Sequence, residues 1–200
     1  AQSAGVRYGS VVRLFGEVTA TRPSNGTRRV LRLGDIVYAG EEVRAGSSAE
    51  AVLRLDDGGM LAVRPQAQFV VERFAAERKP TDQFSLRLLQ GGLRIITGWI
   101  GRSNRANYRI QTLTATIGIR GTGLYLEVEP RRTYACTCYG EVELAPRDRP
   151  QEAETVRTTH HEQPRFIYAD GAMPPGSMMQ KAPVVNHTDA ELTLLESLVG

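Results

Sequence analysis

Apolar and polar residues alternate with a period of two along several short segments, and this pattern constrains the fold most strongly. In each segment Val, Ile, Leu and Tyr fall on one side while Arg, Glu or Ser fall on the other, as in half-buried β-strands. The clearest segments are residues 50–56, 84–88, 108–111 and 124–129. Turn-forming residues separate such segments, at residues 23–26, 56–59, 90–92 and 146–150. The sequence therefore predicts an all-β fold of stacked short antiparallel strands, either solenoid-like or a sandwich.

The end of the chain has a different pattern. A Pro-Pro-Gly run interrupts regular structure and predicts a linker at about residues 169–186. Thr188 and Glu191, three residues apart, form a capping box, and apolar residues follow at helical spacing. We expect one short helix at about residues 188–199, packed on the sheets or on a partner.

Length and composition fit a single globular domain. The chain has 200 residues, of which 41% are hydrophobic and 24% charged, enough to build a core without crosslinks. We interpret residues 1–200 as one domain with its β core at about residues 9–168. No apolar run approaches the roughly 20 residues that span a bilayer. The N-terminal residues 1–5 resemble a mature end left by cleavage or a trimmed end, and the first reading predicts export.

The charge pattern argues against a nucleic-acid partner. The net charge is +3, and every basic residue except Lys79 and Lys181 is an arginine. These arginines are scattered between apolar residues, whereas nucleic-acid binding requires a basic cluster on one face.

Several motifs together resemble the FecR-type domain over about residues 9–144. They are a Gly-Asp turn with following glycines in 34–46, a strand ending on Asp-Gly in 49–58, Gly-Gly-Leu-Arg at 91–94, Ile-Arg-Gly-Thr at 119–122 and Gly-Glu-Val at 140–142. Arg-Gly-Thr also has a purely structural interpretation, because its glycine permits a tight corner.

The resemblance implies an exported, β-rich domain that binds or senses something in the periplasm or at the cell surface. The best-known members of the family are transmembrane regulators that pass signals from outer-membrane iron transporters to a sigma factor. We find neither a cytoplasmic segment nor a membrane helix in these residues. The expectation taken from the family is therefore limited to the fold class and the compartment.

Two cysteines one residue apart, Cys136 and Cys138, depart from plain β architecture. Residues two apart in a strand share a face, so both thiols point the same way. A turn-rich segment at 146–153 leads to a second candidate strand that contains His160 and His161. Counting back equally along this hairpin places Cys138 opposite residue 160 or 161, with Cβ atoms about 4.5–5.5 Å apart. Only one of the adjacent histidines shares the cysteine face unless the strand bulges.

Two thiolates with one or two imidazoles favour zinc or copper as the metal, with an iron–sulfur centre as a third alternative. A thioether from Met173, Met178 or Met179 would favour copper. Two other interpretations stay open. The cysteines form a strained disulfide, since Cα atoms two apart in a strand lie about 6.6–6.8 Å apart, or they are buried and inert.

Motifs for catalysis are sparse, because no Ser-His-Asp spacing, phosphate loop or His-Glu-x-x-His sequence is present. Trp99 and Tyr108 lie near glycines and would line a glycan-binding groove if they were exposed, or join the core if they were buried.

The predicted function is non-catalytic binding or sensing in the cell envelope, in the periplasm or outside the cell, with an envelope protein or a glycan as partner. The predicted metal ligands are Cys136, Cys138, His160 and His161. One alternative is a periplasmic redox enzyme or metalloenzyme that uses the same centre. Another is a structural module that binds glycan or protein and holds no metal.

Overall fold

The computed structural model describes residues 5–172 and 177–198 and confirms the all-β class. The strands are β1 (Arg7–Phe15), β2 (Val18–Arg22), β3 (Thr27–Val30), β4 (Ile36–Tyr38), β5 (Glu42–Ala45), β6 (Glu50–Leu55), β7 (Met60–Val63), β8 (Gln68–Ala75), β9 (Gln83–Ile96), β10 (Tyr108–Gln111), β11 (Ala115–Glu129), β12 (Arg132–Pro146), β13 (Glu154–Thr158), β14 (Arg165–Tyr168) and β15 (Met179–Lys181). The helices are α1 (Trp99–Ser103) and α2 (Asp189–Leu198), with 3₁₀ turns at Arg105–Asn107 and Pro150–Glu152.

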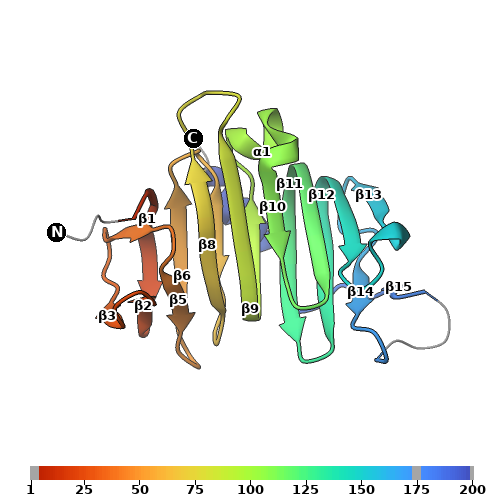
Figure 1. The fold of residues 1–200 in the computed structure, drawn as a ribbon, viewed down its shortest axis with the longest axis horizontal. Helices are drawn as coiled ribbons and strands as arrows, with labels where there is room; N and C mark the ends of the chain where they lie inside the picture. Colours follow the sequence, from red (N-terminus) through yellow and green to blue (C-terminus); the bar gives the residue numbers. More distant parts are fainter. Residues whose placement is uncertain (1–4, 173–176, 199–200) are drawn as a thin grey trace.

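These strands form one sheet that folds over into two layers (Figure 1). The first layer contains β3, β2, β5, β8, β10 and β13, and the second contains β4, β1, β6, β7, β14 and β15. Three long strands, β9, β11 and β12, contribute one half to each layer. The pairings found among the described residues are antiparallel except between β9 and β10, which run parallel. That parallel pair requires a crossover, and the segment containing α1 provides it.

Each of the three long strands bends at a glycine with a positive φ angle: Gly91 in β9, Gly121 in β11 and Gly140 in β12. In β9 the residues before Gly91 pair with β8 and β10, while those after it pair with β7 and β11. The predicted turn at residues 90–92 is therefore wrong. A φ of 72° at Gly91 redirects the strand without ending it.

The Arg-Gly-Thr motif forms the bend of β11. The Arg120 guanidinium donates a hydrogen bond to Glu141 at 2.8 Å. The backbone N–H of Thr122 donates to the Thr97 hydroxyl at 2.9 Å, and the Thr122 hydroxyl donates to the carbonyl of Tyr139. These contacts fit the structural interpretation of the motif, since they join the bend of β11 to β12 and to the residue after β9.

The main core lies between the two layers, and the predicted alternation places its side chains there. In β6, for example, Ala51, Leu53 and Leu55 are buried while Glu50 and Arg54 are exposed. Apolar residues thus fill the space between the layers, as expected of packed sheets.

A second, smaller core covers the outer face of the second layer. All four residues of β7 are buried: Leu61 and Val63 face the main core, and Met60 and Ala62 face the smaller one. Helix α2 packs against this outer face and is seen behind β8 and β9 in Figure 1. The part of the second layer around β7 therefore buries both of its faces.

The predicted C-terminal helix is confirmed, because α2 begins directly after Thr188. The backbone N–H of Glu191 donates to the Thr188 hydroxyl at 3.4 Å, which is the capping contact that the sequence predicts. The five-residue helix α1 was not predicted, because one turn and a half is too short to give a periodic pattern. No described helix has both the length and the apolar character needed to cross a membrane.

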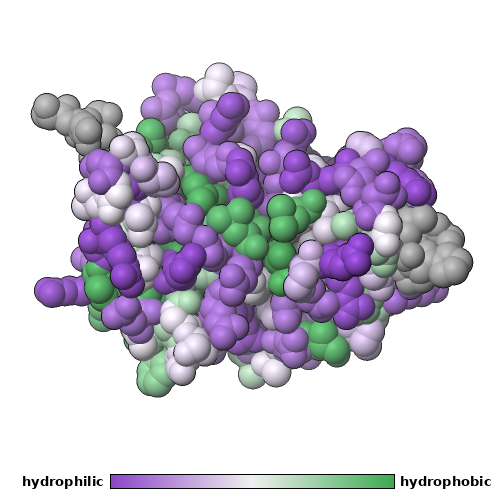
Figure 2. All heavy atoms as spheres, turned by 60° about the horizontal axis from the view of Figure 1, so that its bottom comes forward, coloured by the Kyte–Doolittle hydropathy of each residue, from purple (hydrophilic) through white to green (hydrophobic). Residues whose placement is uncertain are grey.

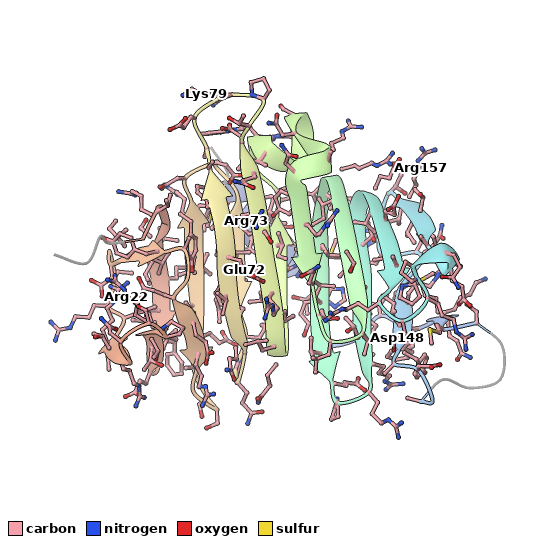
Figure 3. All side chains as sticks on the ribbon, viewed as in Figure 1. Arg22, Glu72, Arg73, Lys79, Asp148 and Arg157 are labelled. Carbon is pink, nitrogen blue, oxygen red and sulfur yellow. The ribbon has the colours of Figure 1, made fainter. Side chains whose placement is uncertain are left out.

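The surface is largely hydrophilic, with apolar residues gathered across the middle of the face that Figure 2 shows. Charged side chains are spread over the molecule, from Arg22 on β2 to Arg157 on β13 at the opposite end (Figure 3). A β-bulge between Val71 and Arg73 leaves Glu72 and Arg73 of β8 both exposed.

The bend of β9 gives a stability prediction. A Cβ on Gly91 would lie 2.7 Å from the Cα of Ala67, whereas a Cβ on Gly26 would meet nothing within 4 Å. Both glycines have positive φ angles. We expect Gly26→Ala to cost about 1 kcal/mol of unfolding free energy through backbone strain alone, and Gly91→Ala to cost about 3 kcal/mol through strain plus overlap. Urea denaturation measures both values, and equal costs would contradict the role given to the bend.

Candidate functional site

The first half of β12 presents both cysteines to the outer face of the second layer. Cys136 and Cys138 are completely buried in the smaller core, together with Tyr134 two residues earlier. The intervening Ala135 faces the main core instead. The shared orientation of the two thiols is thus as predicted from the strand period. Both thiols are free.

Strand β13 returns beside β12 in the predicted register. Gly140 pairs with Thr158, so equal counting places Cys138 opposite His160. Strand β13 ends at Thr158, however, so His160 and His161 lie beyond the strand that was predicted to contain them. The backbone N–H of His161 donates to the carbonyl of Cys138 at 3.1 Å, and His161 itself adopts a left-handed φ of 45°.

The side chains of the two predicted histidines point in different directions at this turn. The Nδ1 atom of His161 lies 3.3 Å from the Sγ atom of Cys136, and its side chain is only 8% exposed. The His160 side chain is 62% exposed and contacts Asp189 at 3.3 Å. The structure brings together Cys136, Cys138 and His161, and leaves His160 at the surface.

His187, just before α2, completes the cluster and was not predicted. Its Nε2 atom lies 3.1 Å from the Nδ1 atom of His161. One donor atom from each of Cys136, Cys138, His161 and His187 lies within 4.8 Å of all the others. The one signal in the sequence is that histidine is rare, with three in the chain. In the structure the rings of His187 and His161 lie 4.9 Å apart between centroids.

The spacing of these atoms suits a tetrahedral metal ion. Zinc binds sulfur at about 2.3 Å and imidazole nitrogen at about 2.0–2.1 Å, so its ligand atoms lie roughly 3.3–3.8 Å apart. The distances from the His161 Nδ1 atom to Cys136 and to His187, 3.3 and 3.1 Å, are close to that range.

Hydrogen bonds fix the orientation of both imidazole rings. The Nδ1 atom of His187 lies 2.5 Å from the carbonyl oxygen of Val185, and a carbonyl can only accept, so this nitrogen carries the proton. The Nε2 atom of His161 lies 3.0 Å from a carboxylate oxygen of Asp189 and is oriented as a donor by the same argument. In the neutral rings the two nitrogens that face each other, Nδ1 of His161 and Nε2 of His187, are then both without a proton. Two lone pairs 3.1 Å apart require a cation or a proton between them.

Arg94 of β9 places a positive charge beside the thiols. Its side chain is completely buried, and it donates to the Sγ atom of Cys138 at 3.4 Å and to the carbonyl of Thr188 at 2.6 Å. Glu191 lies 3.4 Å away and supplies the opposite charge. A buried guanidinium requires such partners, so Arg94 joins the thiols to the start of α2.

The two thiols differ in acidity as a result of their surroundings. A hydrogen bond from the Cys136 thiol lowers the pKa of Cys138, and His187, Arg94 and His161 act in the same direction. The hydrogen bond to Cys138 and burial raise the pKa of Cys136. The pair therefore holds one negative charge more readily than two.

Aromatic residues enclose the cluster. The ring of Tyr125 stacks on His187 with centroids 4.5 Å apart, and the Tyr134 hydroxyl donates to the carbonyl of Pro183 at 2.8 Å. Of the methionines proposed as thioether ligands, Met178 and Met179 are buried outside this smaller core, and Met173 lies outside the described residues. Met60 shares the smaller core with the cysteines.

The two aromatic residues proposed for a glycan-binding groove, Trp99 and Tyr108, differ in their burial. Tyr108 is completely buried and stacks on Phe84 with centroids 4.6 Å apart. Trp99 is half-buried, and its indole N–H donates to Asp82 at 3.1 Å. A separate hollow of about 730 Å³ lies beside the bend of β9 and is lined in part by Tyr125 and Asn186.

Comparison with known proteins identifies the family. No curated protein matches the sequence closely enough to be counted as a relative. Two crystal structures, at 2.50 and 1.65 Å resolution, of a protein from Parabacteroides distasonis ATCC 8503 provisionally named an anti-sigma factor share the fold. Their TM-scores are 0.52 and 0.51 at 13% and 12% identity, and each match covers 70% of this chain and 58% of the other. The family model described as FecR protein matches residues 41–143, and the chain therefore belongs to the FecR family.

Proposed function

We propose that this FecR domain is an exported, non-catalytic binding or sensing module of the cell envelope that holds a metal ion between β12 and the C-terminal segment. The observation that carries the metal proposal is the meeting of Cys136, Cys138, His161 and His187, whose donor atoms lie within 4.8 Å of one another. In this proposal His187 takes the place that the sequence analysis gave to His160.

The chemistry of the donors favours zinc. Two sulfur and two imidazole ligands form the common Cys₂His₂ set of structural zinc sites, whereas magnesium and calcium prefer oxygen. Copper is the second choice, because thiolates also bind Cu(I). The contacts of His161 with Asp189 and of His187 with Val185 support the proposal, because metal-binding histidines usually donate their other N–H to such acceptors.

The closed arrangement favours a structural or sensing role over catalysis. Four protein ligands fill a tetrahedral zinc site, whereas catalytic zinc keeps a position open for water or substrate. Both cysteines are also completely buried. A redox enzyme or metalloenzyme, the alternative function, would need access to the same thiols.

Family membership supports the sensing part of the proposal. The fold is shared with a protein provisionally named an anti-sigma factor, which is a signalling role. We infer that the domain acts by contacting another envelope protein, with a glycan as the alternative partner.

Fractionation of the native host tests the compartment. The domain should be cleaved by protease added to spheroplasts, and protection until the inner membrane is lysed would contradict export.

Metal analysis tests the centre itself. We expect the purified protein to hold one equivalent of zinc, and its cobalt-substituted form to show the intense visible bands of tetrahedral thiolate coordination. Cys136→Ser, Cys138→Ser and His187→Gln should each lower zinc affinity at least 10-fold, because each removes a ligand. His160→Gln is the matched control and should bind zinc normally. Equal losses in all four variants, or no bound metal, would contradict the ligand assignment.

The metal-free protein should show two well-separated thiol ionisations. Because the hydrogen bond from Cys136 and the nearby Arg94 lower the pKa of Cys138, absorbance at 240 nm should report one thiolate already at about pH 7. The second thiolate should form only at strongly alkaline pH, because the pKa of Cys136 is raised. Arg94→Met should move the first ionisation to higher pH, and Arg94→Lys, which keeps the charge, should move it less. Two thiols that titrate together near pH 8.5 would contradict this assignment.

A further inference from the structure

The last segment of the chain is a strap across the outer face of the second layer. We define the C-terminal strap as residues 182–198, which run from the end of β15 through α2. Its apolar side chains, among them Val185, Leu192 and Leu195, cover Met60 and Ile96 of the sheet. It also carries one candidate metal ligand, His187, and the carboxylate that orients another, Asp189.

The strap has little intrinsic tendency to hold its shape. Helix α2 has ten residues, and isolated helices shorter than about 12–15 residues are marginal in water. Among its described residues only Leu192 and Leu195 are buried. The structure of this segment therefore depends on its contacts with the sheet.

The polar contacts of the strap converge on the same place as the candidate metal site. Arg94 donates to the Thr188 carbonyl at 2.6 Å, and Arg64 donates to the Asn186 carbonyl at 2.7 Å. Arg64 also pairs with Glu191 at 2.7 Å, with both side chains partly exposed. These bonds are made by the residues directly before and after His187. An interaction that fixes His187 therefore also holds Asn186 and Thr188 within reach of Arg64 and Arg94.

The facing imidazole nitrogens make this part of the strap sensitive to a bound cation. With an ion between them, His161 and His187 are ligands of one centre that also includes both thiols. Without a cation or proton the same two nitrogens, 3.1 Å apart, repel each other. A metal would thus join the strap to β12 and to the turn after β13, three segments that are distant in sequence.

We propose that metal occupancy controls the docking of the C-terminal strap, so that loss of the ion releases residues 182–198 and uncovers the apolar outer face of the second layer. This inference rests on the proposed metal centre and adds its regulation. Release would expose Met60, Ile96 and Tyr125 together with the charge of Arg94, all of which are buried beneath the strap. The domain would then report metal loss as a newly exposed surface.

The coupling between ion binding and strap docking predicts the size of the change in hydrogen exchange. An ion that binds only the docked form shifts the docking equilibrium by the factor 1 + [ion]/Kd, which is about 100 at a free ion concentration of 100 times Kd. The opening of a local segment is measured by hydrogen exchange of its amides. The amides of α2 should therefore exchange about 100-fold faster after the ion is removed.

Hydrogen exchange with mass spectrometry on the whole chain tests the proposal. The protein is compared in free zinc at about 100 times Kd and after chelation, and bound zinc is measured on the same samples. We expect faster exchange in peptides from the strap after chelation, with no change in peptides from β8. His187→Gln should release the strap even with zinc present, and the matched control His160→Gln should behave like wild type.

Failure of the docking proposal and failure of the metal centre give different results. Zinc bound at one equivalent with strap exchange unchanged by chelation would overturn the docking proposal alone and leave the metal centre standing. A protein that binds no zinc would overturn both. Equal acceleration in the strap and in β8 would also overturn the docking proposal, because the ion would then stabilise the whole domain.

Discussion

Burial of both faces of the second layer around β7, beneath the C-terminal segment, is the constraint on which the candidate site depends. In β7 neighbouring side chains such as Met60 and Leu61 are both completely buried, one under the strap and one in the main core. A polar group on such a strand has no access to water and must find partners inside the protein. The two terminal nitrogens of Arg94 meet this requirement through Thr188, Cys138 and Glu191, whereas its buried Nε has no hydrogen-bond partner among the described residues. The position of the strap, the charge on the thiols and the burial of Arg94 are therefore aspects of one packing arrangement.

The parts of the site that follow from strand geometry could be predicted from the sequence. A period of two places Cys136 and Cys138 on one face, and equal counting along the hairpin places Cys138 opposite residue 160 or 161. The pairing of Gly140 with Thr158 selects residue 160. The prediction became inexact where regular structure ends. Because β13 stops at Thr158 and His161 takes a left-handed conformation, His161 turns inward and His160 outward.

His187 and the bend at Gly91 could not be predicted because both depend on contacts between segments distant in sequence. The capping box describes Thr188 and Glu191 correctly as the start of a helix, but it does not say which surface the helix covers. The pair Gly91–Gly92 is typical of a turn, and only the strand pairings on either side of Gly91 show that one strand passes between the layers there. Local patterns predicted the elements, whereas tertiary packing decided their partners.

The family match and the candidate site overlap only in part. The matched residues 41–143 contain Cys136, Cys138 and Arg94, whereas His161 and His187 come from the segments that follow. Membership of the FecR family therefore accounts for the scaffold without accounting for the two imidazoles. A centre assembled in this way joins the family core to the strap, so anything that binds all four donors also stabilises the docked strap. By linkage, anything that pulls the strap away must weaken binding by the same factor.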